Sequence, residues 1–373
     1  MRCLFFQTRR PIGRPLFFSA TFLEGPKTTQ GPCIWAAKLP TVSWGSPTLG
    51  LAGVASRMGR KNARLTAQDI ARVEGGLPAF IELVVKKITD GSQETKEDSA
   101  FQLRSLAQQD HGTHNEALFA AGAVPPLVKI LSHGTANAQA SAAGALSSMM
   151  GGKVNVQEAF VTSGGVGPLV SLLKMGSAKV QEEAASALAA LDKSEHQPAI
   201  IKAGAIPTIV SMLKAASAAG QAFAAQALAN AAASAEGQNA ITKHGSVPLL
   251  LTLLGEHKAQ VPAARALSKL AHNNTEIQEE ITSAGGITPL LALLNGRHAE
   301  GQVQAAAALS ELARGNTITQ NTIAKAGGIS PLLELLSARS GYHALHACMH
   351  ACIQCRGRWP ASRELLSARS GYP

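Results

Sequence analysis

Apolar and polar positions follow a helical period along most of the chain, and short breaks separate the helical stretches. One stretch runs from Val180 to Leu191, and its alanines and leucines fall three or four residues apart. This spacing places apolar side chains on one face of a helix. A break at Gly176-Ser177 precedes the stretch, and a leucine-rich stretch opens near Pro168 before the break. The pattern predicts an all-α chain of short amphipathic helices.

The helical pattern recurs seven times with a period near 41 residues. A glycine marks each copy, and a proline follows it by three or four residues. The series is Gly75, Gly122, Gly164, Gly204, Gly245, Gly285 and Gly327. Seven residues before each glycine stands an amide side chain: Gln68, Asn115, Gln157, Gln197, Gln238, Gln278 and Gln320. Several residue types recur at a fixed distance from each glycine, which indicates tandem repeats. No single repeat can bury its apolar face alone.

The chemistry of one repeat predicts three helices. A short first helix ends at the glycine, which can adopt the left-handed conformation of a helix stop. The proline then opens a second helix in its first turn, where no amide donor is missed. An alanine-rich third helix follows, and its small side chains let the helices of successive repeats approach closely.

These features resemble the armadillo repeat: three helices, a period near 41, a Gly-x-Ile/Val-Pro turn such as Gly204 to Pro207, and Ala-x-x-Ala-Leu in the third helix. The resemblance covers about residues 64–336 and is closest in style to vacuolar-adaptor-like and plant or protist armadillo scaffold proteins. It implies an all-α, right-handed α-solenoid of about seven repeats. We expect residues 1–63 to be disordered or targeting-like and residues 337–373 to form a degenerate last helix or a disordered tail.

The resemblance also implies a binding surface, because third helices of armadillo proteins line a concave groove that holds extended peptides. Nuclear-import adaptors of the family carry a ladder of Trp and Asn there. Only Asn230 matches that ladder here and no Trp does, which disfavours basic localisation peptides. The side chains predicted to contact a partner are Phe101, Ser148, Ser186, Gln226, Asn230, Arg265, Lys269 and Glu311.

The predicted function is a non-enzymatic scaffold or adaptor that binds partner polypeptides in this groove. The alternatives are a nuclear-transport adaptor for basic peptides and the substrate-recognition part of a ubiquitin ligase assembly, although no U-box domain is apparent. No paired carboxylates, nucleophile elbow or cofactor fingerprint stands out, so we expect no catalytic residues, no cofactor and no bound metal. We expect the protein to be monomeric.

Charge narrows the choice of partner. The net charge of +10 divides into +7 for residues 1–60, −1 for residues 61–336 and +4 for residues 337–373. Nucleic-acid binding needs basic residues clustered on the folded part, so the near-neutral middle disfavours it. No run of about 18 apolar residues occurs, which argues against a membrane span.

The flanks carry the remaining candidate chemistry. All five cysteines lie outside residues 34–347, which fits a reducing compartment and favours a cytoplasmic, or additionally nuclear, location. The arginine-rich start resembles an organelle transit segment, and Met58 offers an alternative start. Cys352 and Cys355 have zinc-ligand spacing, but only one such pair is evident, so a degenerate helix is the favoured interpretation. Residues 334–342 recur identically at 364–372.

Overall fold

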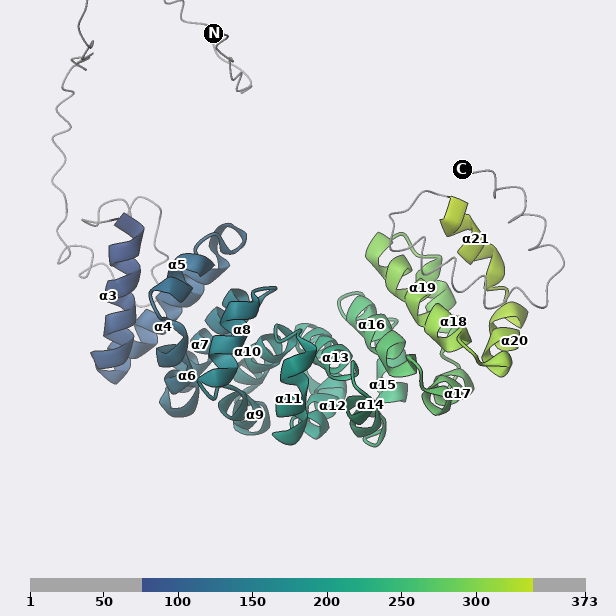
Figure 1. The fold of residues 1–373 in the computed structure, drawn as a ribbon, viewed down its shortest axis with the longest axis horizontal. Coiled ribbons are helices and arrows are strands. Elements are labelled where there is room, and N and C mark those ends of the chain that lie inside the picture. The colour runs from purple at the N-terminus through teal and green to yellow at the C-terminus, as the bar shows by residue number, and fades with distance from the viewer. Residues whose placement is uncertain (1–75, 338–373) are drawn as a thin grey trace, which may run out of the picture. The chain divides into compact units, whose positions relative to one another are not determined.

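The computed structural model of the protein describes residues 76–337, and Figure 1 shows them as a succession of short helices from α3 to α21. All regular structure in this range is helical, which confirms the predicted all-α class. The expected segments 1–63 and 337–373, with Gln68, Gly75 and the cysteine-containing tail, lie outside the described residues except for Ser337.

The helices follow the predicted order of first, second and third helix in each repeat. The first helices are α5 (Asn115–Ala120), α8 (Val154–Thr162), α11 (Gln197–Lys202), α14 (Ala235–Thr242), α17 (Thr275–Ser283) and α20 (Thr317–Lys325). The second helices are α3 (Gly76–Asp90), α6 (Val124–His133), α9 (Val166–Met175), α12 (Ile206–Ala215), α15 (Ser246–Leu253), α18 (Ile287–Leu294) and α21 (Ile329–Ser337). The third helices are α4 (Gln93–Gln108), α7 (Ala136–Met150), α10 (Ala178–Ala189), α13 (Ala218–Ala231), α16 (Gln260–Ala271) and α19 (Ala299–Ala313). Two short 3₁₀ turns, η1 (Gln109–Gly112) and η2 (Ser194–His196), precede α5 and α11.

The glycine of each described repeat ends the first helix as predicted. Gly204 has φ +70°, and its amide donates to the carbonyl of Ile201 over 2.9 Å. A Cβ added there would meet only the Lys174 Nζ atom, at 3.9 Å, so the requirement for glycine comes from the backbone conformation. In the first repeat Gly75 lies outside the described residues, and the next residue, Gly76, has φ +65°.

One continuous core runs through the stack. The third helices pack most extensively against the third helices of the neighbouring repeats, from α4 to α19. Alanines fill these contacts, and Leu188 of α10 and Leu267 of α16 are fully buried between them. Successive repeats thus complete each other's core, as the sequence pattern required.

The amide side chains seven residues before the glycines tie the repeats together. The Nε2 atom of Gln278 donates to the carbonyls of Ala271 and Glu311, both at 3.0 Å, and so joins the ends of two successive third helices. Gln157 donates to the carbonyl of Met150 over 3.1 Å and to Asp192 Oδ1 over 2.9 Å. These buried donors satisfy helix-end carbonyls that would otherwise lack partners.

Among the described helices, none is by itself long and apolar enough to cross a membrane. One bent pair, Ser194–Lys202 and Ile206–Ala215 at 89°, meets that criterion only when both helices are counted together, by length and composition alone.

Candidate functional site

The six described third helices present one row of side chains at matching positions, which we call the third-helix face. Its two positions per helix are Phe101 and Ser105, Gly144 and Ser148, Ser186 and Ala190, Gln226 and Asn230, Arg265 and Lys269, and Ala307 and Glu311. Each pair is four residues apart and therefore lies on one side of its helix. All eight residues predicted to contact a partner lie in this row, seven of them partly exposed and Lys269 exposed.

Gln226, Asn230 and Arg265 form a connected cluster at the centre of the face. The Gln226 Nε2 atom donates to Asn230 Oδ1 over 3.0 Å, and Arg265 donates to Gln226 Oε1 over 3.4 Å. Asn230 Nδ2 in turn donates to the carbonyl of Ala189, at the end of α10, over 2.9 Å. This network holds polar side chains of two adjacent repeats in fixed positions, as a preformed binding surface requires.

Lys269 and Glu311 continue the row in different electrostatic surroundings. Glu311 accepts a hydrogen bond from Arg314 over 2.9 Å and lies 3.0 Å from the Nδ1 atom of His272. Within residues 76–337, the Lys269 ammonium makes no ion pair or side-chain hydrogen bond. Lys269 is therefore a solvated cation in the middle of the face, available to a carboxylate or a carbonyl of a partner.

Serines and one aromatic ring form the N-terminal part of the face. The hydroxyls of Ser186 and Ser147 lie 2.7 Å apart and join α10 to α7. Ser148 instead donates to the carbonyl of Gly144, in its own helix, over 3.1 Å. Phe101 is partly exposed on α4. Of these three side chains, that of Ser186 alone makes a hydrogen bond to the neighbouring repeat within the described residues.

One ion pair in the N-terminal part of the face joins two repeats that are not adjacent. Arg104 of α4 pairs with Glu183 of α10 across α7, at the point where α7 has Gly144. A Cβ on Gly144 would lie 2.8 Å from Glu183 Oε2 and 2.9 Å from Arg104 Nε, so glycine leaves the space for this pair. Burial raises the pKa of the Glu183 carboxyl, and the Arg104 guanidinium only partly opposes that rise.

The chemistry offered by the face is recognition by hydrogen bonds and charge. The face carries amides, hydroxyls, one guanidinium, one ammonium and one carboxylate, and these groups can pair with the donors and acceptors of an extended peptide backbone. In the part of the chain that the structure describes, no group of three or more His, Cys, Asp or Glu side chains could hold a metal ion.

Two features of this region did not emerge from the sequence. One is the Arg104–Glu183 pair, whose members are 79 residues apart. The other is a second series of glutamines, at the start of the third helices, that donate to carbonyls at the end of the second helices or, for Gln302, just beyond it. These are Gln139, Gln181, Gln221 and Gln302. The repeat spacing could have revealed this series, because its members keep step with the glycines.

Known proteins support the assignment of the fold. The armadillo/β-catenin-like repeat family matches residues 155–190 and 274–314. An engineered protein of known crystal structure is 31% identical with a TM-score of 0.68; the match covers 82% of this chain and 73% of that one. A designed armadillo repeat protein is 26% identical with a TM-score of 0.57, covering 62% of this chain and 99% of the design.

A second designed armadillo repeat protein, solved in complex with the peptide (KR)4, is also 26% identical; its TM-score is 0.55, with 62% of this chain and 99% of the design covered. No curated protein matches the chain. The finer likeness to vacuolar-adaptor-like proteins therefore stays a prediction. The repeat spacing, the three-helix units and these matches together establish that the chain belongs to the armadillo-repeat family.

Proposed function

We propose that this protein is a non-enzymatic scaffold that binds extended segments of partner proteins along the third-helix face. The observation that carries the proposal is the ordered cluster of Gln226, Asn230 and Arg265 beside the solvated Lys269. A binding face built from rigid helices, with polar side chains already held in place, loses little entropy when a peptide is bound.

The comparison with the designed proteins supports this proposal. One of them was solved with a bound peptide, and it shares the repeat architecture of this chain. The peptide in that structure is basic, whereas Lys269 on the face here is a cation without an acidic partner among the described residues; Arg265 is already paired with Glu300 over 3.2 Å. The unpaired Lys269 and the absence of Trp at the ladder positions favour partners other than basic localisation peptides, and so favour a scaffold over a nuclear-transport adaptor. We also retain the cytoplasm as the proposed compartment, because the cysteines lie outside residues 34–347.

The test is a selection of peptides from a random displayed library against the full chain, followed by titration of the enriched peptide. The double variant Arg265→Ala/Lys269→Ala should weaken binding by about ten-fold or more, because both side chains face the peptide. A matched control is Lys214→Ala/Lys243→Ala, which also removes two positive charges but lies outside the third helices.

Circular dichroism melts of the variants separate lost binding from lost folding. Equal affinity for the native chain and for Arg265→Ala/Lys269→Ala would contradict the proposed face. Failure of the folded native chain to enrich any peptide would contradict the scaffold proposal itself. A titration with (KR)4 addresses the transport alternative, for which we expect no saturable binding.

A further inference from the structure

A cavity separate from the third-helix face opens between the first two described repeats. Its volume is about 420 Å³, within the roughly 300–1,000 Å³ of ligand pockets. We call it the turn-edge pocket, because it lies where second helices turn into third helices. Its lining residues are Ile88, Thr89, Gln93, Lys96, Pro126, Lys129, Ile130, His133, Gly134 and Ala138.

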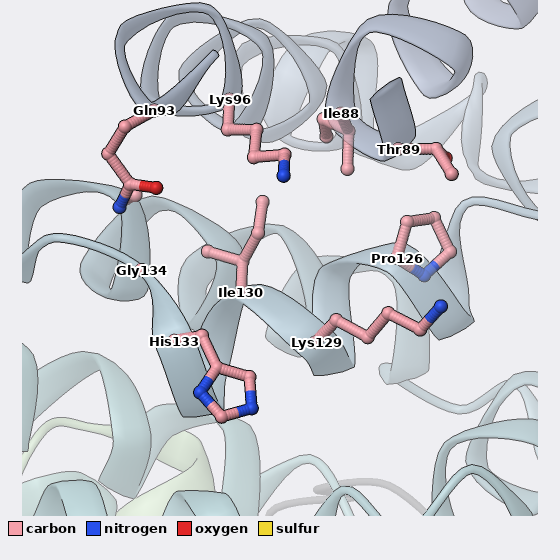
Figure 2. Close-up of a pocket in the computed structure, with 10 residues that line it drawn as sticks. Ile88, Thr89, Gln93, Lys96, Pro126, Lys129, Ile130, His133 and Gly134 are labelled. Atoms are coloured by element: carbon pink, nitrogen blue, oxygen red, sulfur yellow. The ribbon is translucent and has the colours of Figure 1, made fainter. Parts of the chain in front are cut away.

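The floor of the turn-edge pocket is apolar. Ile88 of α3, Ile130 of α6 and Ala138 of α7 are buried, with at most 4% of their surface exposed. Figure 2 shows Ile88 directed from the upper helix toward Ile130 and Pro126 below. At Gly134 an added Cβ would lie 2.7 Å from the carbonyl of Ile130, so no side chain can fill this part of the wall. The gap between the repeats thus leaves room for an aliphatic side chain.

The rim of the pocket is basic. Lys96, Lys129 and His133 line it, no acidic residue does, and Figure 2 shows the Lys96 ammonium reaching toward Ile130. None of these three side chains has an ion pair or hydrogen bond within residues 76–337. Three acids directly follow lining residues in the sequence. Asp90 and Glu94 do not line the pocket, and Glu97 accepts from the Thr135 hydroxyl over 2.6 Å and the Asn137 amide over 3.0 Å. The positive charges at the rim are therefore left without internal partners.

A second cavity of about 450 Å³ occupies the corresponding edge between the fifth and sixth repeats. Pro289 and Leu293 line it at the places that Pro126 and Ile130 take in the first pocket. Ala292 stands where the turn-edge pocket has Lys129, and no lysine lines this cavity. The imidazole of His298, at the rim of this cavity, already has a hydrogen bond, because its Nδ1 atom accepts from the amide of Gly301 over 3.1 Å. Among the described residues, Arg297 is the one Lys or Arg side chain that lines the second cavity, so this cavity serves as an internal comparison with one such cation where the turn-edge pocket has two, Lys96 and Lys129.

We propose that the turn-edge pocket binds a short segment of a partner protein in which an aliphatic side chain is flanked by acidic residues. The aliphatic side chain would enter between Ile88 and Ile130 and remove their remaining surface from water. The flanking carboxylates would pair with Lys96 and Lys129. Gln93, Lys129 and His133 are exposed, so the peptide chain can run past the pocket at both ends.

The experiment titrates the full chain with a fluorescein-labelled peptide of sequence Asp-Glu-Leu-Asp-Glu and follows anisotropy. Methyl NMR of isoleucine-labelled protein locates the site, and we expect the Ile88 and Ile130 signals to shift. Lys96→Glu/Lys129→Glu should weaken binding by about ten-fold or more, because each reversal replaces attraction by repulsion.

Matched variants separate the pocket from general attraction to a basic surface. Lys174→Glu/Lys214→Glu makes the same change of charge on exposed last-turn lysines of α9 and α12, and we expect it to leave the affinity unchanged. Replacing the leucine of the peptide by serine should abolish saturable binding. Arg265→Ala/Lys269→Ala reports any binding of the acidic peptide to the third-helix face, and the shifts of Ile88 and Ile130 should persist in this variant.

Three results would overturn the proposal. The first is saturable binding without shifts at Ile88 and Ile130. The second is equal affinity for the leucine and serine peptides, which would indicate charge alone. The third is loss of binding in Arg297→Glu, at the second cavity, or in the third-helix variant, while Lys96→Glu/Lys129→Glu still binds.

Discussion

The two halves of the third-helix face use the same fold in different ways. In the N-terminal half, α4, α7 and α10 carry five acidic and three basic residues, and the Arg104–Glu183 pair crosses the middle helix. In the C-terminal half, α13, α16 and α19 carry two of each, and the side chains connect only neighbouring helices. The N-terminal half is therefore the more acidic, while each half contains an internal ion pair: Arg104–Glu183 in the first and Arg265–Glu300 in the second.

The size of one side chain per helix accounts for this difference. Gly144 leaves a gap through which Arg104 and Glu183 meet from repeats on either side. At the corresponding positions of the fourth and fifth repeats stand Gln226 and Arg265, whose long side chains bond to each other instead. Gly144 thus lets α4 pair with α10 across α7, while Gln226 and Arg265 join adjacent repeats and leave Lys269 free for a partner.

The largest predicted effect tests whether the two halves of the third-helix face differ in their buried core as well as at their surface. Leu188→Ala in the N-terminal half and Leu267→Ala in the C-terminal half should each lower the free energy of unfolding by about 2–5 kcal/mol, because both side chains are fully buried. Urea denaturation measures both. Similar losses would place the difference between the halves at the surface alone, whereas an unchanged unfolding curve for either variant would contradict the shared core.

A smaller effect concerns the buried glutamines that join the repeats. Gln278→Ala should cost about 1–3 kcal/mol, since it leaves two helix-end carbonyls without a donor. Gln157→Ala should cost less, because one of its acceptors, Asp192, is exposed and can be hydrated. The control is Gln304→Ala on a partly exposed position of α19. Denaturation curves that rank Gln304→Ala as the most damaging would refute this role.

The smallest effect is the pH dependence of the Arg104–Glu183 pair. Burial raises the pKa of Glu183 above its ordinary value of 4.5, so the folded chain binds this proton more tightly than the unfolded chain does. The native state therefore loses stability, relative to Glu183→Gln, as the pH rises from below 4.5 through the raised pKa. The free energy of unfolding of the native chain minus that of Glu183→Gln should therefore fall as the pH rises across that range. A difference that rises with pH would mean that Arg104 lowers the pKa of Glu183 more than burial raises it.

The local features of the fold could be predicted from the sequence because they repeat. The glycine and proline positions, such as Gly204 and Pro207, indicated the helix ends, and the alanine pattern indicated which helices form the core. The conserved spacing of Gln278 and its counterparts was also visible. The acceptors of Gln278 were not, because the carbonyl of Glu311 lies 33 residues away and is brought close only by stacking.

The candidate site was predictable only in part, because contacts between repeats form only when the repeats stack. The third-helix register identified Gln226, Asn230, Arg265 and Lys269 as neighbours. The bridge over Gly144 depends on side chains from repeats that are not adjacent in sequence, and the turn-edge pocket depends on a gap between two repeats. Neither leaves a pattern within one repeat, so three-dimensional packing is needed to find them.

The central claim is that the third-helix face holds an extended partner segment. A crystal structure of the full chain with the peptide enriched by library selection tests it most directly. We predict that the peptide lies across α10, α13 and α16 and contacts Asn230, Arg265 and Lys269. A peptide bound elsewhere, with no contact to these three helices, would contradict the account.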